Sequence, residues 1–245
     1  MDRPTVSIVA PVFNEADIID ELVARCLGIL ERVHGSAELL LVDDASTDAT
    51  RERLRACADR DARLRLVLLD KNVGQFRATQ RGLTAARGAV VVTLDGDLQD
   101  PPELIPALVR QLRANPQLDV VFAQKLSRED PLWVKAGAWL YRRLQRLLCG
   151  ARWPGAVGSF TAMHAALAGE VAGVDMAHAN LAAVIVSLHA RFDALGYHRD
   201  PRRNGESRVG LWGLVCEAWG SLRVSGGLWS EAFRGLASPR RARDP

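Results

Sequence analysis

Two aspartates separated by a single glycine stand at the end of a short apolar segment. Asp95 and Asp97 follow the segment 89–94, and Gln99 lies two residues further along. Two carboxylates in one turn repel each other unless a cation lies between them. Carboxylate and amide oxygens are ligands that suit Mg²⁺ or Mn²⁺. The spacing predicts a divalent-cation site whose ion is shared with the pyrophosphate of a bound nucleotide. An acidic turn that merely caps the helix expected from Pro101 would show the same pattern.

A second acidic pair follows another apolar segment. Asp43 and Asp44 come directly after residues 39–42, and Ser46, Asp48 and Thr50 follow them. Short polar side chains of this kind are typical of a helix N-terminus, where they accept hydrogen bonds from backbone N–H groups. The pattern therefore fits a helix cap. It fits equally well a carboxylate that accepts a hydrogen bond from a nucleobase N–H.

The elements that must position these residues alternate in type along the first half of the chain. Short apolar runs predict strands, and apolar positions with a period near 3.6 predict helices. The expected strands are 6–12, 39–42, 64–69, 89–94 and 120–123, and the expected helices are 18–33, 51–60, 75–86 and 101–112. Repeated strand–helix units predict an α/β fold with a mostly parallel central sheet, right-handed crossovers and helices on both faces.

Open parallel sheets bind ligands at the carboxyl ends of their strands. Three polar clusters lie at such ends: Asn14 and Glu15, then the pair at 43–44, then the turn at 95–97. Neither G-x-G-x-x-G nor G-x-x-x-x-G-K-[ST] occurs after the first strand, which disfavours a standard dinucleotide fold and P-loop chemistry. The three clusters therefore predict a different kind of nucleotide site.

Composition limits the remaining classes. The chain has 245 residues, 48% hydrophobic and 25% charged, which is ordinary for a globular protein with a sizeable core. No segment approaches 18 consecutive apolar residues, so we expect no transmembrane helix, and we expect no signal peptide. The four cysteines form no C-x-x-C pair, which fits buried thiols in a reducing cytoplasm. The net charge of +3 is modest, so we expect no nucleic-acid partner.

The second half contains two segments suited to a membrane surface. Residues 133–148 predict an amphipathic helix with an apolar face and four cations, and residues 211–229 contain three tryptophans. Trp at an apolar–polar boundary, with Arg or Lys above it, is typical of interfacial helices. We expect peripheral membrane contact, with packing of both segments on the core as the alternative. Residues 181–188 are apolar but of undetermined type.

The motifs together are more specific than any of them alone. In order they are P-V-F-N-E at 11–15, V-D-D-x-S-x-D-x-T at 42–50, N-x-G-Q at 72–75, L-D-G-D-L-Q-D-P-P-E at 94–103 and R-x-x-G-E-S-R at 202–208. This series resembles the family 2 inverting glycosyltransferases, which have a GT-A nucleotide-sugar-binding fold. Within that family it is similar to polyprenyl-phosphate sugar transferases, such as dolichyl-phosphate mannose synthases and undecaprenyl-phosphate aminoarabinose transferases.

The resemblance implies roles for residues at matching positions. The nucleotide-sugar site would comprise Pro11, Phe13, Glu15, Asp43, Asp44, Gln75 and Asp95. The ion, Mg²⁺ or Mn²⁺, would be held by Asp95, Asp97 and Gln99. The acceptor phosphate would meet Lys125, Arg128, Arg202, Ser207 and Arg208. Of these residues, Asp97, Arg128, Arg202 and Arg208 would act directly in catalysis.

The resemblance also implies an organisation and a reaction. Residues 1–200 would form the glycosyltransferase domain, 201–237 an acceptor- and membrane-proximal segment, and 238–245 a disordered basic tail. A UDP- or GDP-linked sugar would pass to polyprenyl phosphate at the cytoplasmic face of the membrane. The chain departs from the family at Ala156, where relatives usually carry Asp. That departure leaves two alternatives open: a glycan or protein hydroxyl as acceptor, and a nucleotide-sugar-binding pseudoenzyme.

Overall fold

The computed structural model describes residues 4–33, 35–126, 143, 157–174 and 181–198. In this part of the chain the strands are β1 (Val6–Val12), β2 (Ala37–Asp43), β3 (Leu64–Leu68), β4 (Val90–Thr93), β5 (Val120–Lys125), β6 (Val157–His164) and β7 (Phe192–Tyr197). The helices are α1 (Ile19–Leu30), α2 (Thr50–Ala58), α3 (Gln75–Ala85), the 3₁₀ turn η1 (Pro102–Leu104), α4 (Ile105–Ala114), α6 (Ala165–Ala172) and α7 (Leu181–Ser187).

These strands form one sheet in the order β3-β2-β1-β4-β6-β5-β7. Strands β3, β2, β1 and β4 are parallel, and β7 is parallel to β5. Strand β6 lies between β4 and β5 and runs antiparallel to both. The mostly parallel sheet is confirmed, whereas β6 and β7 were not expected. Both strands mix polar and small residues with apolar ones, so neither forms the continuous apolar run typical of a doubly buried strand.

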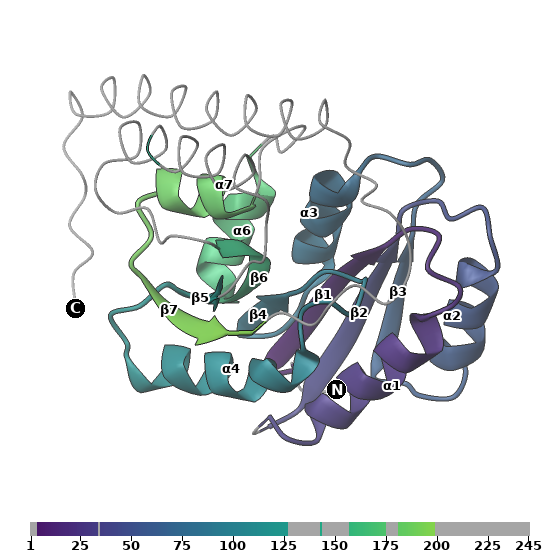
Figure 1. Ribbon diagram of the computed structural model, residues 1–245, viewed down its shortest axis with the longest axis horizontal. Helices are drawn as coiled ribbons and strands as arrows, with labels where there is room; N and C mark the ends of the chain where they lie inside the picture. Colours follow the sequence, from purple (N-terminus) through teal and green to yellow (C-terminus); the bar gives the residue numbers. More distant parts are fainter. Residues whose placement is uncertain (1–3, 34, 127–142, 144–156, 175–180, 199–245) are drawn as a thin grey trace.

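Helices cover both faces of the sheet, as predicted (Figure 1). One core cluster joins α1, α2 and α4 to one face, and the other joins α3, α6 and α7 to the opposite face. Strand β1 supplies both clusters, because Ile8 and Ala10 point to the first and Val9 to the second. This two-sided burial explains why β1 and β2 read as nearly continuous apolar runs.

The four helices predicted between residues 18 and 112 are present, with ends that differ by a few residues. The helix expected over 101–112 is divided into η1 and α4, and Pro106 stands in the first turn of α4. Proline lacks the N–H that a helix interior needs and is tolerated in a first turn, so a new α-helix begins at Ile105. Residues 181–187, left undetermined by the sequence, form the buried helix α7.

Several sequence predictions fall outside the described residues. They are Arg128, Arg202, Ser207, Arg208, Ala156, the segment 211–229, the tail 238–245 and, apart from the exposed Arg143, the helix at 133–148. Among the helices that the structure describes, none is long and apolar enough to cross a membrane.

Candidate functional site

The carboxyl ends of β1, β2 and β4 meet at one edge of the sheet. Val12 pairs with Asp43 across β1 and β2, and Val9 pairs with Thr93 across β1 and β4. The three polar clusters predicted from the sequence therefore lie side by side. Gly96 permits this approach, because a Cβ atom there would come within 2.6 Å of the carbonyl oxygen of Pro11.

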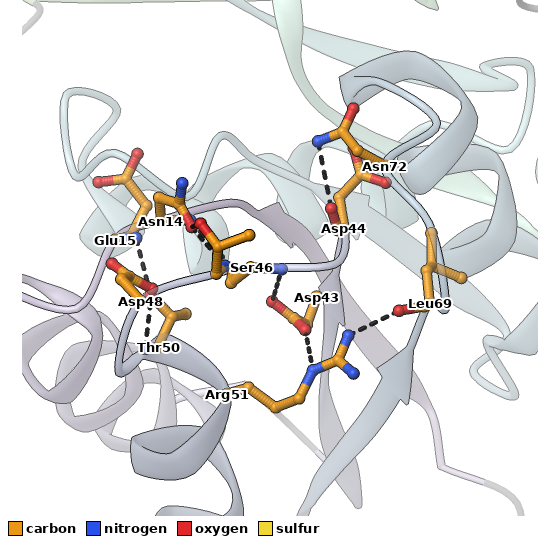
Figure 2. Close-up of polar contacts among 11 residues, drawn as sticks. Asn14, Glu15, Asp43, Asp44, Ser46, Asp48, Thr50, Arg51, Leu69 and Asn72 are labelled. Carbon is orange, nitrogen blue, oxygen red and sulfur yellow. Dashed lines mark hydrogen bonds and ion pairs between the residues drawn. The ribbon is translucent and has the colours of Figure 1, made fainter.

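Polar contacts join the loops after β1 and β2 (Figure 2). The backbone N–H of Asn14 donates to Ser46 Oγ at 2.9 Å, and its side-chain oxygen accepts from the N–H of Thr47 at 2.8 Å. The N–H of Glu15 donates to Thr50 Oγ1 at 2.8 Å. The hydroxyl cluster after β2 therefore holds the neighbouring loop. The carboxylate of Glu15 points away from Thr50.

The adjacent aspartates at the end of β2 point in opposite directions (Figure 2). Asp43 is fully buried, and its Oδ2 accepts from Arg51 Nε at 2.6 Å. Its Oδ1 accepts from the N–H of Ser46 at 3.2 Å. Arg51 also donates to the carbonyl oxygen of Leu69 at 2.6 Å. The carboxylate of Asp43 thus serves the fold: it holds the loop at Ser46 and binds α2 through Arg51, which in turn binds the residue after β3.

Asp44 fixes the start of α3. Its two carboxylate oxygens accept from the backbone N–H groups of Val73 at 2.7 Å and Gly74 at 2.9 Å. Gly74 has a φ of 86°, a left-handed conformation that favours glycine. Burial raises the pKa of Asp44, with repulsion from Asp43 adding to it and the two backbone N–H groups opposing it. The carboxylate therefore has one defined orientation at the edge of the site.

Gln75, the first residue of α3, connects this region to the Asp-Gly-Asp turn. Its side-chain nitrogen donates to Asp95 Oδ1 at 2.6 Å. The hydroxyl of Ser159, on β6, donates to the same oxygen. Loss of surrounding water raises the pKa of Asp95 to about 6, and repulsion from Asp100 and Asp97 adds to the shift. The carboxylates of Asp95, Asp97 and Asp100 therefore lie close together, and their repulsion disfavours the ionised form of Asp95.

The turn after Asp95 continues into a buried acidic residue. Asp97 Oδ1 accepts from the N–H of Gln99 at 3.1 Å, and Gln99 is only 5% exposed. Asp100 is fully buried and accepts a hydrogen bond from the hydroxyl of Tyr197 on β7. The ammonium of Lys125, at the end of β5, lies 4.0 Å from the same Asp100 oxygen. A cation is thereby placed next to the predicted metal-binding turn.

Backbone strain is concentrated at this edge. Four described residues other than glycine have a positive φ, and three of them follow the ends of β1, β2 and β4: Asn14 (54°), Ala45 (62°) and Leu98 (57°). Asn tolerates the left-handed conformation, whereas for Ala45 and Leu98 it is unfavourable and persists where the surrounding contacts enforce it, often at functional sites. The loops are therefore held in place by their neighbours rather than by their own preferences.

The structure brings together much of the site predicted from the sequence. Asp44, Gln75, Asp95, Asp97 and Lys125 lie around one edge, with Pro11 buried behind the turn and Phe13 and Glu15 half-buried beside it. Glu103, at the end of the D-P-P-E run, instead pairs with Arg25 of α1 at 2.7 Å. Asp100, Ser159 and Tyr197 also contact this edge and were not predicted from the sequence. Asp100 lies within the quoted motif at 94–103, Ser159 lies three residues after Ala156, and nothing local marks Tyr197.

With its mostly parallel sheet and an Asp-x-Asp turn at the carboxyl edge, the chain has the GT-A glycosyltransferase fold, as its structural neighbours do. The structure is similar to a mannosyltransferase from Pyrobaculum calidifontis solved with GDP-Man and Mn²⁺, with a TM-score of 0.55 and 20% identity over 98% of this chain and 77% of that one. It is also similar to glucosyl-3-phosphoglycerate synthase from Mycobacterium tuberculosis solved with Mn²⁺ and UDP, with a TM-score of 0.61 and 22% identity over 91% and 80% of the two chains.

The chain belongs to glycosyl transferase family 2, whose sequence profile matches residues 7–171. It is similar to an undecaprenyl-phosphate 4-deoxy-4-formamido-L-arabinose transferase from Edwardsiella ictaluri, with 40% identity. That alignment covers 59% of this chain and 42% of the relative. It is also similar to an uncharacterized glycosyltransferase from Synechocystis, with 30% identity over 85% of this chain and 65% of the relative. The chain thus spans between two fifths and two thirds of these relatives.

Proposed function

We propose that this chain is an inverting, metal-dependent glycosyltransferase that transfers a sugar from a UDP- or GDP-linked donor to a polyprenyl phosphate. The observation that carries the proposal is the linked series Asp44, Gln75 and Asp95. It runs from the end of β2, through the first residue of α3, to the turn after β4. A nucleoside diphosphate is an extended ligand, so it suits a site whose polar groups are held in a row.

Within this series each part of the donor has a matching group. Asp44 offers a fixed carboxylate edge to a nucleobase N–H, beside Pro11, Phe13 and Glu15. Asp95 faces the ribose and the diphosphate. Asp43 supports the pocket from behind, because it points away from Asp44 and its charge is paired with Arg51. Each oxygen of Asp44 accepts one backbone N–H and keeps a second acceptor position for a nucleobase N–H.

The acidic turn fits a divalent ion that is shared with substrate. Among the described residues, no three His, Cys, Asp or Glu side chains are grouped to hold an ion by themselves. Mg²⁺ is commonly bound by one or two carboxylates together with substrate phosphates. Asp97 and Asp95, with Gln99 beside them, match this donor set. A bound ion would offset the negative charge that develops on the leaving nucleoside diphosphate.

The acceptor is proposed from chemistry and from the named relatives. A lipid phosphate is already ionised at neutral pH, so it can attack the anomeric carbon without a general base. A sugar hydroxyl usually depends on a base that contributes roughly 10²–10⁴-fold. Ala156 in place of the family's Asp is therefore more compatible with a phosphate nucleophile. Lys125 stands at the site edge to meet that phosphate, and we assign the same role to Arg128, Arg202, Ser207 and Arg208.

The location follows from the acceptor. A polyprenyl phosphate keeps its headgroup at the membrane surface, so an enzyme bound at that surface can reach it without extracting the lipid tail. We propose that the protein acts at the cytoplasmic face of the membrane. The predicted amphipathic segment 133–148 and the Trp-containing segment 211–229 would provide the contact.

A transfer assay tests the proposal against its alternatives. The full chain is incubated with Mn²⁺, a panel of UDP- and GDP-sugars, and either undecaprenyl phosphate vesicles or soluble glycans. We expect glycolipid to form with one donor and only with the lipid acceptor. Transfer to soluble hydroxyls would support the alternative acceptor. Tight nucleotide binding with neither transfer nor hydrolysis would support the pseudoenzyme.

A further inference from the structure

Two hydroxyl groups from the second half of the chain hold the two ends of the acidic turn. Ser159 of β6 donates to Asp95 at the start of the turn, and Tyr197 of β7 donates to Asp100 at its end. We propose that Ser159 and Tyr197 are positioning residues that set the geometry of the turn for ion and diphosphate binding. The inference rests on the proposed function, since it assigns the turn to the ion.

The contacts of Asp95 give its carboxylate a direction. The hydrogen bonds that Asp95 accepts from Gln75 and Ser159 both fall on Oδ1. With Oδ1 held from two sides, Oδ2 is the oxygen presented to a ligand. Ser159 is itself held in place, because its carbonyl oxygen accepts from Thr93 Oγ1 at 2.5 Å. The hydroxyl therefore comes from a strand already fixed to β4.

Tyr197 holds the other end from a rigid position. Its side chain is buried, and its ring meets that of Phe160 edge to face, with centroids 6.0 Å apart. Its carbonyl oxygen accepts from the N–H of Leu126 at 3.0 Å, which binds the end of β7 to the end of β5. Asp100 also lies 4.0 Å from the ammonium of Lys125. Tyr197 thus fixes the carboxylate that orients Lys125.

The turn needs such restraint for two physical reasons. Asp95, Asp97 and Asp100 bring three carboxylates into six residues, and their mutual repulsion favours a more open loop. Leu98 is held in a left-handed conformation with φ of 57°, which an unrestrained leucine would leave. Ion ligands must be held close to their binding geometry, and partners that orient them commonly contribute 10- to 100-fold to metal affinity.

The test compares variants that remove one hydroxyl each. Ser159→Ala and Tyr197→Phe are expected to weaken Mn²⁺ binding about 10- to 100-fold, measured by electron paramagnetic resonance in the presence of UDP or GDP. Both are expected to lower kcat more than they raise the KM for the donor. Ser159→Thr is expected to stay within about threefold of wild type, because its hydroxyl can still donate to Asp95.

A matched control separates positioning from general loss of stability. Thr161, two residues along β6, contacts Thr93 Oγ1 at 3.0 Å rather than the acidic turn. Thr161→Val is expected to lower the melting temperature without changing Mn²⁺ affinity.

The inference is overturned if Ser159→Ala and Tyr197→Phe bind Mn²⁺ as wild type does, or if Thr161→Val weakens binding equally. Failure of the wild-type chain to bind Mn²⁺ with either nucleotide would overturn the proposed function, and this inference with it.

Discussion

Glu38 offers a quantitative test of how the sheet is stabilised at the edge opposite the site. It lies near the start of β2, is only 6% exposed, and accepts three hydrogen bonds. The donors are Ser7 Oγ at 2.6 Å, the N–H of Arg87 at 2.9 Å and a guanidinium nitrogen of Arg65 at 2.7 Å. Glu38→Gln keeps one accepting oxygen but places an amide NH₂ against the Arg65 guanidinium, donor against donor.

The expected loss lies between two known limits. Breaking a fully buried ion pair destabilises a protein by about 3–5 kcal/mol, because the remaining charge stays buried. An exposed pair contributes about 0–1 kcal/mol. The Arg65 side chain is 29% exposed, so water can partly solvate it after the substitution. We therefore expect Glu38→Gln to lower the free energy of unfolding by ~2 kcal/mol at pH 7.

The effect should depend on pH in a defined direction. Burial raises the pKa of Glu38, but the three hydrogen bonds more than offset this, and the pKa lies below its ordinary value. A carboxyl whose pKa is lowered by folding stabilises the protein above its unfolded pKa of about 4.3, and that stability is lost as pH falls through the folded value. The difference between wild type and Glu38→Gln should therefore shrink below pH ~4.

Urea unfolding followed by circular dichroism, at several pH values between 7 and 3.5, measures both effects. Glu103→Gln is the matched control, because the Glu103 side chain is 46% exposed in its pair with Arg25. We expect it to change stability by less than about 1 kcal/mol. The reasoning is refuted if Glu38→Gln lies within about 0.5 kcal/mol of wild type at pH 7, the range of an ordinary surface substitution. A difference that does not change with pH would also refute it.

Further predictions concern the site, the packing of α3 and the membrane. Asp97→Ala should abolish turnover while changing stability by less than about 1 kcal/mol, and full activity in excess EDTA would contradict the metal role. Arg202→Ala and Arg208→Ala should lower turnover with phosphate acceptors far more than they lower donor affinity, because a guanidinium group binds phosphate bidentately. If donor affinity falls equally and turnover of bound donor is unchanged, the two arginines are donor-binding residues instead. Gly82→Ala should destabilise the protein, because the new Cβ would lie 2.3 Å from Val9 Cγ1 and overpacking costs about 1–3 kcal/mol. This loss should exceed the gain of about 1 kcal/mol in helix propensity. A raised melting temperature would show that Val9 moves freely. Sedimentation with anionic liposomes should show binding at low salt that weakens at high salt, and no binding at either would reject the membrane prediction.

The local sequence pattern was sufficient to predict those strands that are buried along nearly their whole length. Strands β1 and β2 are mostly apolar on both faces, so their amino-acid sequences alone identify them as strands. The polar residues that follow them must therefore lie at a strand end. Strand β6 offers no such signal, since only four of its eight residues, Phe160–Met163, are buried. Its antiparallel insertion between β4 and β5 could not be predicted, because strand order depends on partners distant in sequence.

The sequence by itself determined the alternation of strands and helices, the acidic clusters at three strand ends, and the family to which their order points. Only the tertiary structure decided which contacts each aspartate makes. Asp43 and Asp44 are neighbours in sequence, yet one is bound to Arg51 and the other to the start of α3. The contacts that orient Asp95 and Asp100 come from residues 64 and 97 positions away. Such pairings leave no local signal, because they depend on how the sheet assembles rather than on the neighbours of each residue.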